Sequence, residues 1–260
     1  MLVAITRGIS PRFADCELTH IAREPIDSVR ANGEHAAYEA LLRELGAELH
    51  RLPADPGLPD CVFVEDTAVV LPECAVITRP GAGSRRPETT AVEETLSGWR
   101  TLHRIEPPGT LDGGDVLVLD KRVLVGLGGR SNASGIRQLG ACLAPRGYTV
   151  EAVPLRDCLH LKSAVTRAGP QTLILNPAWV DAGLFRGWQI VEVHPAEPGA
   201  ANVLLVGDEL VTAAHHPRSR ERLQRAGLRP RTLQAAEVAK AEGALTCCSL
   251  IFEAAAQGVQ

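Results

Sequence analysis

Two adjacent cysteines near the C-terminus are the residues whose type offers the most chemistry. Cys247 and Cys248 lie in an apolar, β-prone run, TCCSLIF. Side chains alternate along a strand, so only one of the two can face a given cavity. A cysteine in such a run is more often a small buried hydrophobe, because a nucleophile must reach its thiolate form. A cationic substrate would favour that form, since positive charge beside the sulfur stabilises the thiolate.

A histidine in the segment LHLKSAV could serve as the partner of a reactive cysteine. His160 alternates with Leu159 and Leu161, which predicts that His160 and Lys162 share one face of a strand. An isolated histidine on a strand is usually structural. Beside a cysteine it becomes the natural general acid and base, because its pKa lies near neutral pH.

Acidic residues interrupt two apolar runs. Glu65 and Asp66 in VEDTA are costly inside a sheet unless a cation or hydrogen bonds compensate them. Asp112 and Asp115 flank two glycines in LDGGDVL, which fits a tight turn or a cavity wall where glycine allows close backbone approach. Acids without metal-ligand spacing, together with one histidine and one cysteine, indicate a bound cation rather than a metal.

Arginines follow two glycine-rich turns. Arg85 and Arg86 end the segment ITRPGAGSRR, and Arg130 lies in GLGGRSN. Arginines in turns are most often solvated. If these point inward, they could hold a carboxylate by paired hydrogen bonds.

Composition excludes several classes of protein. The 260 residues carry a formal charge of −4, without the basic excess that binding to nucleic acid or an anionic membrane requires. Seven cysteines with no C-x-x-C pair argue against a disulfide framework or a zinc knuckle. No apolar run approaches the ~20 residues that cross a bilayer, and the N-terminus lacks the pattern of a secretion signal. We therefore expect a cytoplasmic protein with no membrane partner.

The elements that must position these residues recur along the chain. Short apolar runs come in pairs at spacings of roughly 40 to 50 residues, which indicates a repeated unit. Helical stretches follow the pairs, and a longer amphipathic helix is expected over residues 27–50. The paired runs are 62–71 with 74–80, 115–120 with 122–128, 160–166 with 172–176, 202–206 with 209–214, and 246–252 with 2–6.

This unit, strand–strand–helix–strand used about five times, predicts an α/β ring of blades rather than a doubly wound sheet. Ordinary α/β alternation is the competing interpretation, and the absence of G-x-G-x-x-G disfavours a dinucleotide site. No linker divides the chain, so residues 1–260 are expected to form a single catalytic domain. In a ring, the strand ends converge on a central cavity. The polar residues expected to meet there are Glu65, Asp66, Asp112, Asp115, His160, Asn202 and Cys247.

Six motifs taken in order carry a family resemblance over essentially the whole chain. They are PDCVFVEDTAVV, ITRPGAGSRRPE, LDGGDVLVLD, VGLGGRSN, LHLKSAV and LTCCSLIF. The set resembles dimethylarginine dimethylaminohydrolase, a family of the guanidino-group-modifying amidinotransferase-fold superfamily. The resemblance implies a five-bladed, pseudo-symmetric α/β propeller around a central active site.

The resemblance also implies roles for individual residues. Cys247 matches the nucleophile and His160 the general acid and base. Asp66 and Asp112 match carboxylates that hold the guanidinium, and Glu65 matches a further acid of the site. Arg85 and Arg130 match the residues that hold the α-carboxylate of the substrate. The positions around its amino-acid end are Asp60 and the backbone at Leu18 and Ala241. Ala241 and Glu242 depart from the branched residue and the aspartate that the family often has there.

The implied reaction is hydrolysis of methylated or dimethylated arginine to citrulline and an amine, through a covalent S-alkylthiouronium on Cys247. The partner is therefore a small molecule, a homodimer is left open, and no cofactor or metal is required. Zinc could inhibit by capturing Cys247. The alternatives are a hydrolase of unmodified arginine and an amidinotransferase, whose relatives are usually longer, and a non-catalytic arginine-binding protein, which would need neither Cys247 nor His160.

Overall fold

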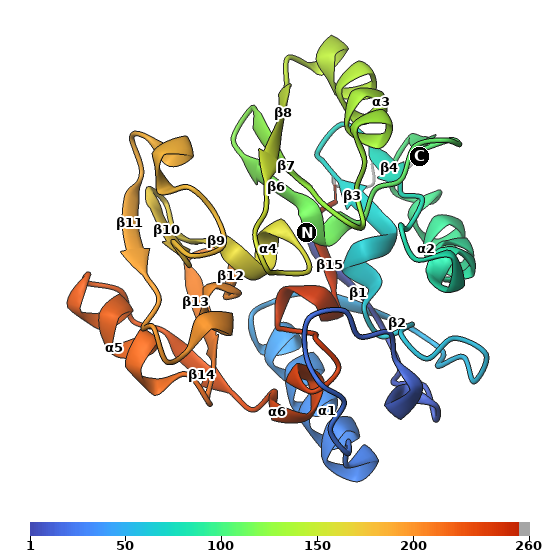
Figure 1. The fold of residues 1–260 in the computed structure, drawn as a ribbon. Helices are drawn as coiled ribbons and strands as arrows, with labels where there is room; N and C mark the ends of the chain where they lie inside the picture. Colours follow the sequence, from blue (N-terminus) through green and yellow to red (C-terminus); the bar gives the residue numbers. More distant parts are fainter. Residues whose placement is uncertain (255–260) are drawn as a thin grey trace.

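Five three-stranded sheets, here called blades 1 to 5, surround a common centre (Figure 1). The computed structural model describes residues 1–254. In every blade the first strand runs antiparallel to the second, and the second runs parallel to the third. The predicted ring of strand–strand–helix–strand units is confirmed.

Each blade is built from three strands. Blade 1 contains β15 (Leu250–Glu253), β1 (Leu2–Arg7) and β2 (Glu48–Leu52); blade 2 contains β3 (Ala68–Val70), β4 (Ala75–Ile77) and β5 (Leu102–Arg104); blade 3 contains β6 (Val116–Leu119), β7 (Arg122–Leu127) and β8 (Thr149–Pro154); blade 4 contains β9 (Val165–Gly169), β10 (Thr172–Leu175) and β11 (Gln189–Glu192); blade 5 contains β12 (Leu204–Val206), β13 (Glu209–Ala213) and β14 (Arg231–Leu233).

The ring closes where the two ends of the described chain pair. β1 lies antiparallel to β15, with Leu2 opposite Glu253 and Ile5 opposite Leu250. The expected pairing of the first and last strands is therefore confirmed. It holds the segment that carries Cys247 beside the N-terminal strand, although the two are far apart in sequence.

Helices connect the second and third strands, because parallel neighbours need a crossover connection. Those of blades 1, 2, 3 and 5 are α1 (Ser28–Glu44), α2 (Thr89–Leu96), α3 (Ala133–Leu143) and α5 (Pro217–Arg225), which lie on the outside of the ring (Figure 1). Blade 4 departs from the predicted unit, because only the 3-10 turn η6 (Ala182–Phe185) lies between β10 and β11.

The predicted long helix over residues 27–50 is shorter than expected. Asp27 caps α1 by accepting hydrogen bonds from the backbone N–H groups of Val29 and Arg30, each at 3.0 Å. The helix ends at Glu44, and Gly46 follows in the left-handed region with φ +88°. Glycine adopts this conformation without strain, so the chain turns there and residues 48–52 become β2.

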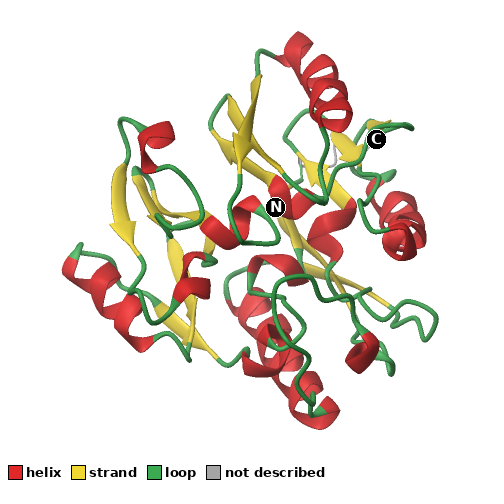
Figure 2. Cartoon of the chain, viewed as in Figure 1, coloured by secondary structure: helices red, strands yellow, loops and turns green. Residues whose placement is uncertain are grey.

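A short helical turn precedes the first strand of every blade, near the centre of the ring (Figure 2). The sequence predicted strands at several of these positions, and that prediction was wrong. A turn leaves backbone N–H groups free to pair with buried side chains, whereas an apolar strand would bury the acids without partners. These inner turns are η2 (Val64–Thr67), η4 (Gly113–Asp115), α4 (Leu161–Ala164), η7 (Pro198–Ala201) and η8 (Thr246–Cys248).

In the part of the chain that the structure describes, no helix is both long and apolar enough to cross a membrane.

Replacing Gly113 with alanine should destabilise the fold. A β-carbon there would overlap the carbonyl oxygen of Glu65 and crowd that of Ala68. Because both obstacles are backbone atoms, we expect a loss of about 1 to 3 kcal/mol, the usual cost of overpacking, in urea-induced unfolding. The control is Gly33→Ala in α1, where nothing lies within 4 Å. That change should be neutral or stabilising, and equal effects of the two would contradict the role assigned to Gly113.

Candidate active site

Cys247 and Cys248 face different surroundings because they lie on a tight turn. Cys247 is half-buried in η8 and lines a small cavity that also contacts Asp66 and His160. Cys248 is 3% exposed, belongs to a hydrophobic core, and donates from its sulfur to the Ala244 carbonyl at 3.7 Å. The expectation that one cysteine of the pair faces the cavity holds, although strand alternation is not the reason.

His160 is a buried imidazole held between two carboxylates. Its Nε2 lies 3.0 Å from Asp112 Oδ2, and its Nδ1 lies 3.8 Å from Asp66 Oδ1. Burial alone lowers the pKa of this imidazole, but the negative charges of Asp66 and Asp112 outweigh burial and raise the pKa to about 9. The ring is therefore an imidazolium at neutral pH.

The predicted shared face of His160 and Lys162 is wrong. His160 precedes the four-residue helix α4 and lies against the cavity that Cys247 lines. Lys162 lies within α4 and reaches the other way, where its Nζ contacts Glu65 Oε1 at 2.7 Å. The helical turn separates two side chains that a strand would have placed side by side.

Asp112 and Asp115 hold His160 in position, Asp112 through the imidazole and Asp115 through the backbone that follows it. Asp112 is fully buried and accepts a hydrogen bond from the Gly81 N–H at 2.8 Å, while its other oxygen faces His160. Asp115 accepts from the Ser131 hydroxyl at 2.6 Å and from the backbone N–H of Leu161 at 3.1 Å. Burial raises the pKa of Asp115 to about 7. Asp115 fixes the start of α4, and thereby the backbone that carries His160.

Asp66 forms a buried ion pair with Arg85. The carboxylate accepts from Arg85 Nη1 at 2.6 Å and from the Gly114 N–H at 3.0 Å. Burial opposes ionisation of Asp66, but the charges of His160 and Arg85 prevail and lower its pKa. Arg85 is 3% exposed and also donates to Glu88 Oε2 at 2.8 Å and to the Phe63 carbonyl at 3.1 Å. Arg85 therefore already has acidic partners on two sides.

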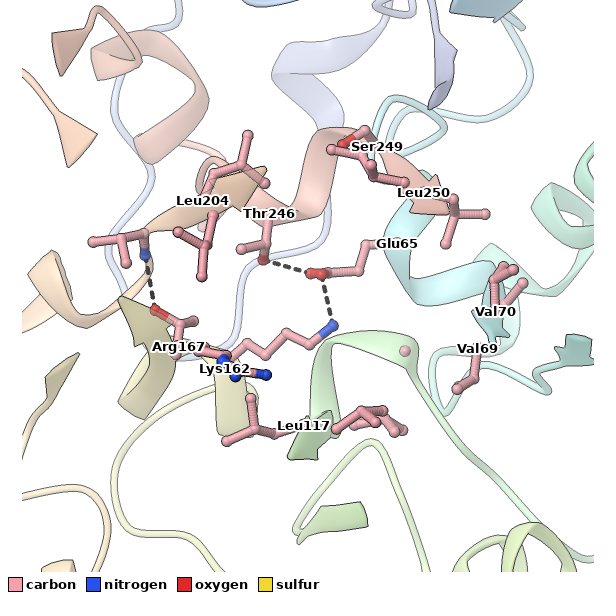
Figure 3. Close-up of a pocket in the computed structure, with 18 of the residues that line it drawn as sticks. Glu65, Val69, Val70, Leu117, Lys162, Arg167, Leu204, Thr246, Ser249 and Leu250 are labelled. Atoms are coloured by element: carbon pink, nitrogen blue, oxygen red, sulfur yellow. Dashed lines mark hydrogen bonds and ion pairs between the residues drawn. The ribbon is translucent and has the colours of Figure 1, made fainter. Parts of the chain in front are cut away.

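Glu65 lies on the opposite side of the same turn. Its carboxylate accepts from Lys162 Nζ and from the Thr246 hydroxyl, each at 2.7 Å (Figure 3). These three residues line a cavity of about 610 Å³ along the axis of the ring. The first strands of all five blades contribute to its wall through Val69, Leu117, Arg167, Leu204 and Leu250 (Figure 3).

The residues that follow Glu65 and Thr246 in the sequence line the small cavity instead of the axial one. Asp66 and Cys247 face the small cavity with His160, whereas Glu65 and Thr246 face the axial one. The ion pair of Glu65 with Lys162 thus lies between the two spaces.

Arg130 and Asp60 also line the small cavity. Arg130 makes two long contacts, 3.5 Å to Asp112 Oδ2 and 3.3 Å to the Thr19 hydroxyl. Asp60 accepts from the backbone N–H of Glu17 at 3.1 Å, and burial raises its pKa. Of the two arginines predicted to bind a carboxylate, Arg130 has the weaker contacts and is the freer to rearrange.

Residues 17–20 form a lid over the small cavity, and Glu242 holds it. The Glu242 carboxylate accepts from the backbone N–H groups of Thr19 at 2.6 Å and His20 at 2.8 Å. Glu242 has φ +59°, a left-handed conformation that costs a non-glycine residue about 1 kcal/mol or more. Leu18, within the lid, packs against the hydrophobic core, and Ala241 is buried at the cavity wall.

The surroundings of Cys247 favour its neutral thiol form. Burial raises its pKa well above the usual range, and the negative charges of Glu65 and Asp66 raise it further. A cation bound beside these acids would have the opposite effect, because it stabilises the thiolate.

Most of the predicted site residues meet. Lining the small cavity together are Asp60, Asp66, Arg85, Arg130, His160, Ala241 and Cys247. Asp112 does not line this cavity but contacts His160, which does. Glu65 lines the axial cavity instead, and Leu18 lies in the lid. Sequence reasoning missed Glu88 and Thr246 as supports and Glu242 as the residue that holds the lid. Asp115, which the sequence placed at the centre of the ring, supports the backbone that carries His160.

Oxygen and nitrogen atoms of Asp66, Asp112 and His160 lie within 4.8 Å of one another, the spacing of a metal site. All three are already compensated within the protein. Asp66 pairs with Arg85, and Asp112 with His160. The cluster is therefore explained as a hydrogen-bonded network that needs no ion.

Comparison with known proteins gives consistent relatives. The sequence model of the arginine deiminase family matches residues 56–194. The chain is 42% identical to N(G),N(G)-dimethylarginine dimethylaminohydrolase of Streptomyces coelicolor over 95% of both chains, and 36% identical to that of Pseudomonas aeruginosa over 87% of this chain and 90% of the relative. A crystal structure of a mutant of the Pseudomonas aeruginosa protein with citrulline superposes with TM-score 0.91 and 34% identity, covering 96% of this chain and 98% of that one.

Replacing Glu242 with glutamine should loosen the lid. A neutral amide offers one acceptor oxygen in place of two charged ones, and hydrogen bonds to charged groups contribute about 1.5 to 3 kcal/mol each. We expect hydrogen–deuterium exchange at Thr19 and His20 to accelerate by about tenfold or more. The matched control is Glu24→Gln, an exposed residue just beyond the lid. Unchanged exchange in the Glu242 variant would show that the carboxylate does not hold the lid.

Proposed function

The chain belongs to the dimethylarginine dimethylaminohydrolase family, and from this premise we propose that Cys247 is its nucleophile and His160 its general acid and base. The chain is a hydrolase that acts on the C–N bond of methylated arginine and releases citrulline. The substrate is a small molecule, and the residues proposed to act on it come from the turns at the centre of the ring.

One observation carries the assignment of residues. The only half-buried thiol on the inner turns, within residues 1–254, shares a cavity with a buried imidazole and an ionised carboxylate, Asp66. A guanidinium is a planar cation, so it fits beside carboxylates and presents its central carbon to a thiolate. The observed contacts support Asp66 as the acid nearest to the substrate.

The first half of the reaction forms the covalent intermediate. Binding of the cationic substrate lowers the pKa of Cys247, so the thiol releases its proton to solvent, and the thiolate sulfur forms a bond to the guanidinium carbon. The tetrahedral adduct collapses as the bond from carbon to the methylated nitrogen breaks. The His160 imidazolium donates its proton to that nitrogen, so methylamine or dimethylamine leaves as a neutral molecule.

The second half regenerates the enzyme. Neutral His160 takes a proton from water, and the water oxygen attacks the carbon of the S-alkylthiouronium. The C–S bond then breaks, the hydroxyl proton of the adduct passes to the departing sulfur, and citrulline is released with the Cys247 thiol restored. Asp112 acts through His160 as a positioning residue, because its carboxylate lies on Nε2 and leaves Nδ1 toward Asp66 and the cavity.

This assignment changes the role proposed for Asp112. The resemblance gave it the guanidinium, but its carboxylate oxygens contact His160, Arg130 and the Gly81 N–H. Arg130, Asp60 and the lid residue Leu18 remain the proposed contacts for the amino-acid end of the substrate, with the backbone at Ala241. We propose Arg85 as the support of Asp66 as well as a carboxylate ligand, since its guanidinium already binds that acid.

The site draws on the turns of several blades, so no blade contains it alone. We propose that the chain works as one catalytic domain, because Cys247, Asp66 and His160 come from the turns of three different blades.

Replacing Cys247 with serine should reduce turnover by more than about a thousandfold while substrate binding remains measurable. The matched control is Cys248→Ser, which changes the adjacent thiol and should retain most activity because that thiol faces the core. Citrulline formation from dimethylarginine, monomethylarginine and arginine gives the measurement. Activity that survives in Cys247→Ser, or is lost only in Cys248→Ser, would refute the nucleophile assignment. Faster turnover of plain arginine would refute the substrate assignment alone.

Replacing Asp112 with asparagine should lower the pKa of His160 from about 9 by about 1 to 3 units, because a negative charge at hydrogen-bond distance is removed. Histidine-selective ¹⁵N NMR measures the shift directly. The raised pKa means that protonated His160 stabilises the fold fully below its unfolded pKa near 6.5, and that this stabilisation is lost as the pH rises through about 9.

In urea-induced unfolding, Asp112→Asn should therefore lose the stabilisation from protonated His160 at a lower pH than the parent protein does. Glu192→Gln, an exposed acid on β11, is the control and should leave the His160 titration unchanged. An unchanged pKa in Asp112→Asn would contradict the proposed coupling.

A further inference from the structure

Two cysteines and a histidine meet outside the active site, where blade 2 packs against the helix of blade 3. Cys74 immediately precedes β4, His103 lies on β5, and Cys142 lies in α3. The two cysteine sulfurs and one ring nitrogen of His103 lie within 4.8 Å of one another. None of the three residues contributes to the cavity at Cys247. The proposed reaction gives them no role.

We propose that Cys74, His103 and Cys142 form a binding site for a thiophilic metal ion of the Zn²⁺ class. Two thiolates and an imidazole are the donor set that such ions prefer, and harder ions such as Mg²⁺ or Ca²⁺ disfavour sulfur. Tetrahedral bonds to zinc would place these donor atoms about 3.5 to 3.8 Å apart. Small side-chain rotations bring donors within 4.8 Å to that spacing.

The exposure of two of the three residues would let an ion reach the site from the surface. Cys74 is fully buried, whereas His103 and Cys142 are partly exposed. Three protein donors leave a fourth position for water, as in open zinc sites. The ion would join the second and third blades, which Cys74 and Cys142 already connect through their shared hydrophobic cluster.

Arg146 controls access to the imidazole. Its Nη1 donates to the Cys142 carbonyl at 2.7 Å, and its Nη2 lies 3.0 Å from His103 Nε2. A guanidinium is always a donor, so Nε2 must be an acceptor here and the ring proton must lie on Nδ1. The Nε2 lone pair is thus unprotonated but accepts a hydrogen bond from Arg146.

The same guanidinium competes with a metal, because both are cations and both use the Nε2 lone pair. Burial raises the pKa of both thiols, and the charge of Arg146 partly offsets this rise. Metal binding must therefore release protons from the thiols and displace Arg146 from the imidazole. We expect removal of the arginine charge to tighten binding of the ion.

The test uses the full-length Cys247→Ser protein, kept reduced, so that the thiol in the active site cannot bind metal. Titration with Co²⁺ should give a thiolate-to-cobalt charge-transfer band that saturates at one equivalent and disappears when Zn²⁺ is added. Adding Cys142→Ser or His103→Gln should weaken binding by at least about tenfold. Adding Arg146→Gln should strengthen it.

The matched control is His50→Gln. His50 occupies the outer strand of blade 1, as His103 does in blade 2, but its imidazole pairs with Glu48. This change should leave cobalt binding unaltered, and unfolding curves of the metal-free variants should match the parent. No charge-transfer band in the parent, or a band of equal affinity in both Cys142→Ser and His103→Gln, would overturn the proposed site.

Discussion

The structure depends on the compensation of buried charge at the centre of the ring. Asp66, Asp112 and His160 are all nearly inaccessible to water, and an unpaired ion in such a place costs several kcal/mol. Each is paired within the protein, Asp66 with Arg85 and Asp112 with His160. Loss of one partner would leave the other charge unpaired, so these residues hold one another in place.

The ring geometry follows from the same requirement. The polar residues at the centre are distant in sequence, and most of them lie at the turns before the first strands of different blades, whereas Arg85 lies after β4 in the 3-10 helix Gly83–Glu88. Glu65 comes from blade 2, Lys162 from blade 4 and Thr246 from blade 1, yet their side chains form one chain of hydrogen bonds (Figure 3). Closure by β1 and β15 sets the position of the last turn, and therefore of Cys247.

Residue pattern alone predicted the repeat and the pairing of the first and last strands, because strand pairs leave a strong apolar signal at a regular spacing. It failed at the inner turns. Apolar residues beside Glu65, His160 and Cys247 suggested strands, but the buried polar side chains need N–H donors that a short helical turn leaves free. The local sequence does not reveal this need, because the N–H donors lie far away in the chain. Gly114 donates to Asp66, and Leu161 donates to Asp115.

Some site residues could likewise be predicted from sequence motifs, whereas their long-range partners could not. The motifs predicted Cys247, His160 and Asp66 at one cavity, and the structure brings them to it. Contacts between distant segments were beyond reach of the sequence. Glu242 binds the lid more than 200 residues before it, and Glu88 shares Arg85 with Asp66. Such pairings become visible only when the blades are arranged in space.

The charge arrangement also keeps the Cys247 thiol in its less reactive, protonated form. Two nearby carboxylates and burial hold the Cys247 thiol in its neutral form, which is a poor nucleophile. In the proposed mechanism, a guanidinium entering the cavity reverses the balance, because its positive charge offsets Glu65 and Asp66 beside the sulfur. Neutral or anionic electrophiles bring no such charge. The proposed activation of Cys247 is therefore coupled to recognition of a cation, beside the lid that Glu242 holds.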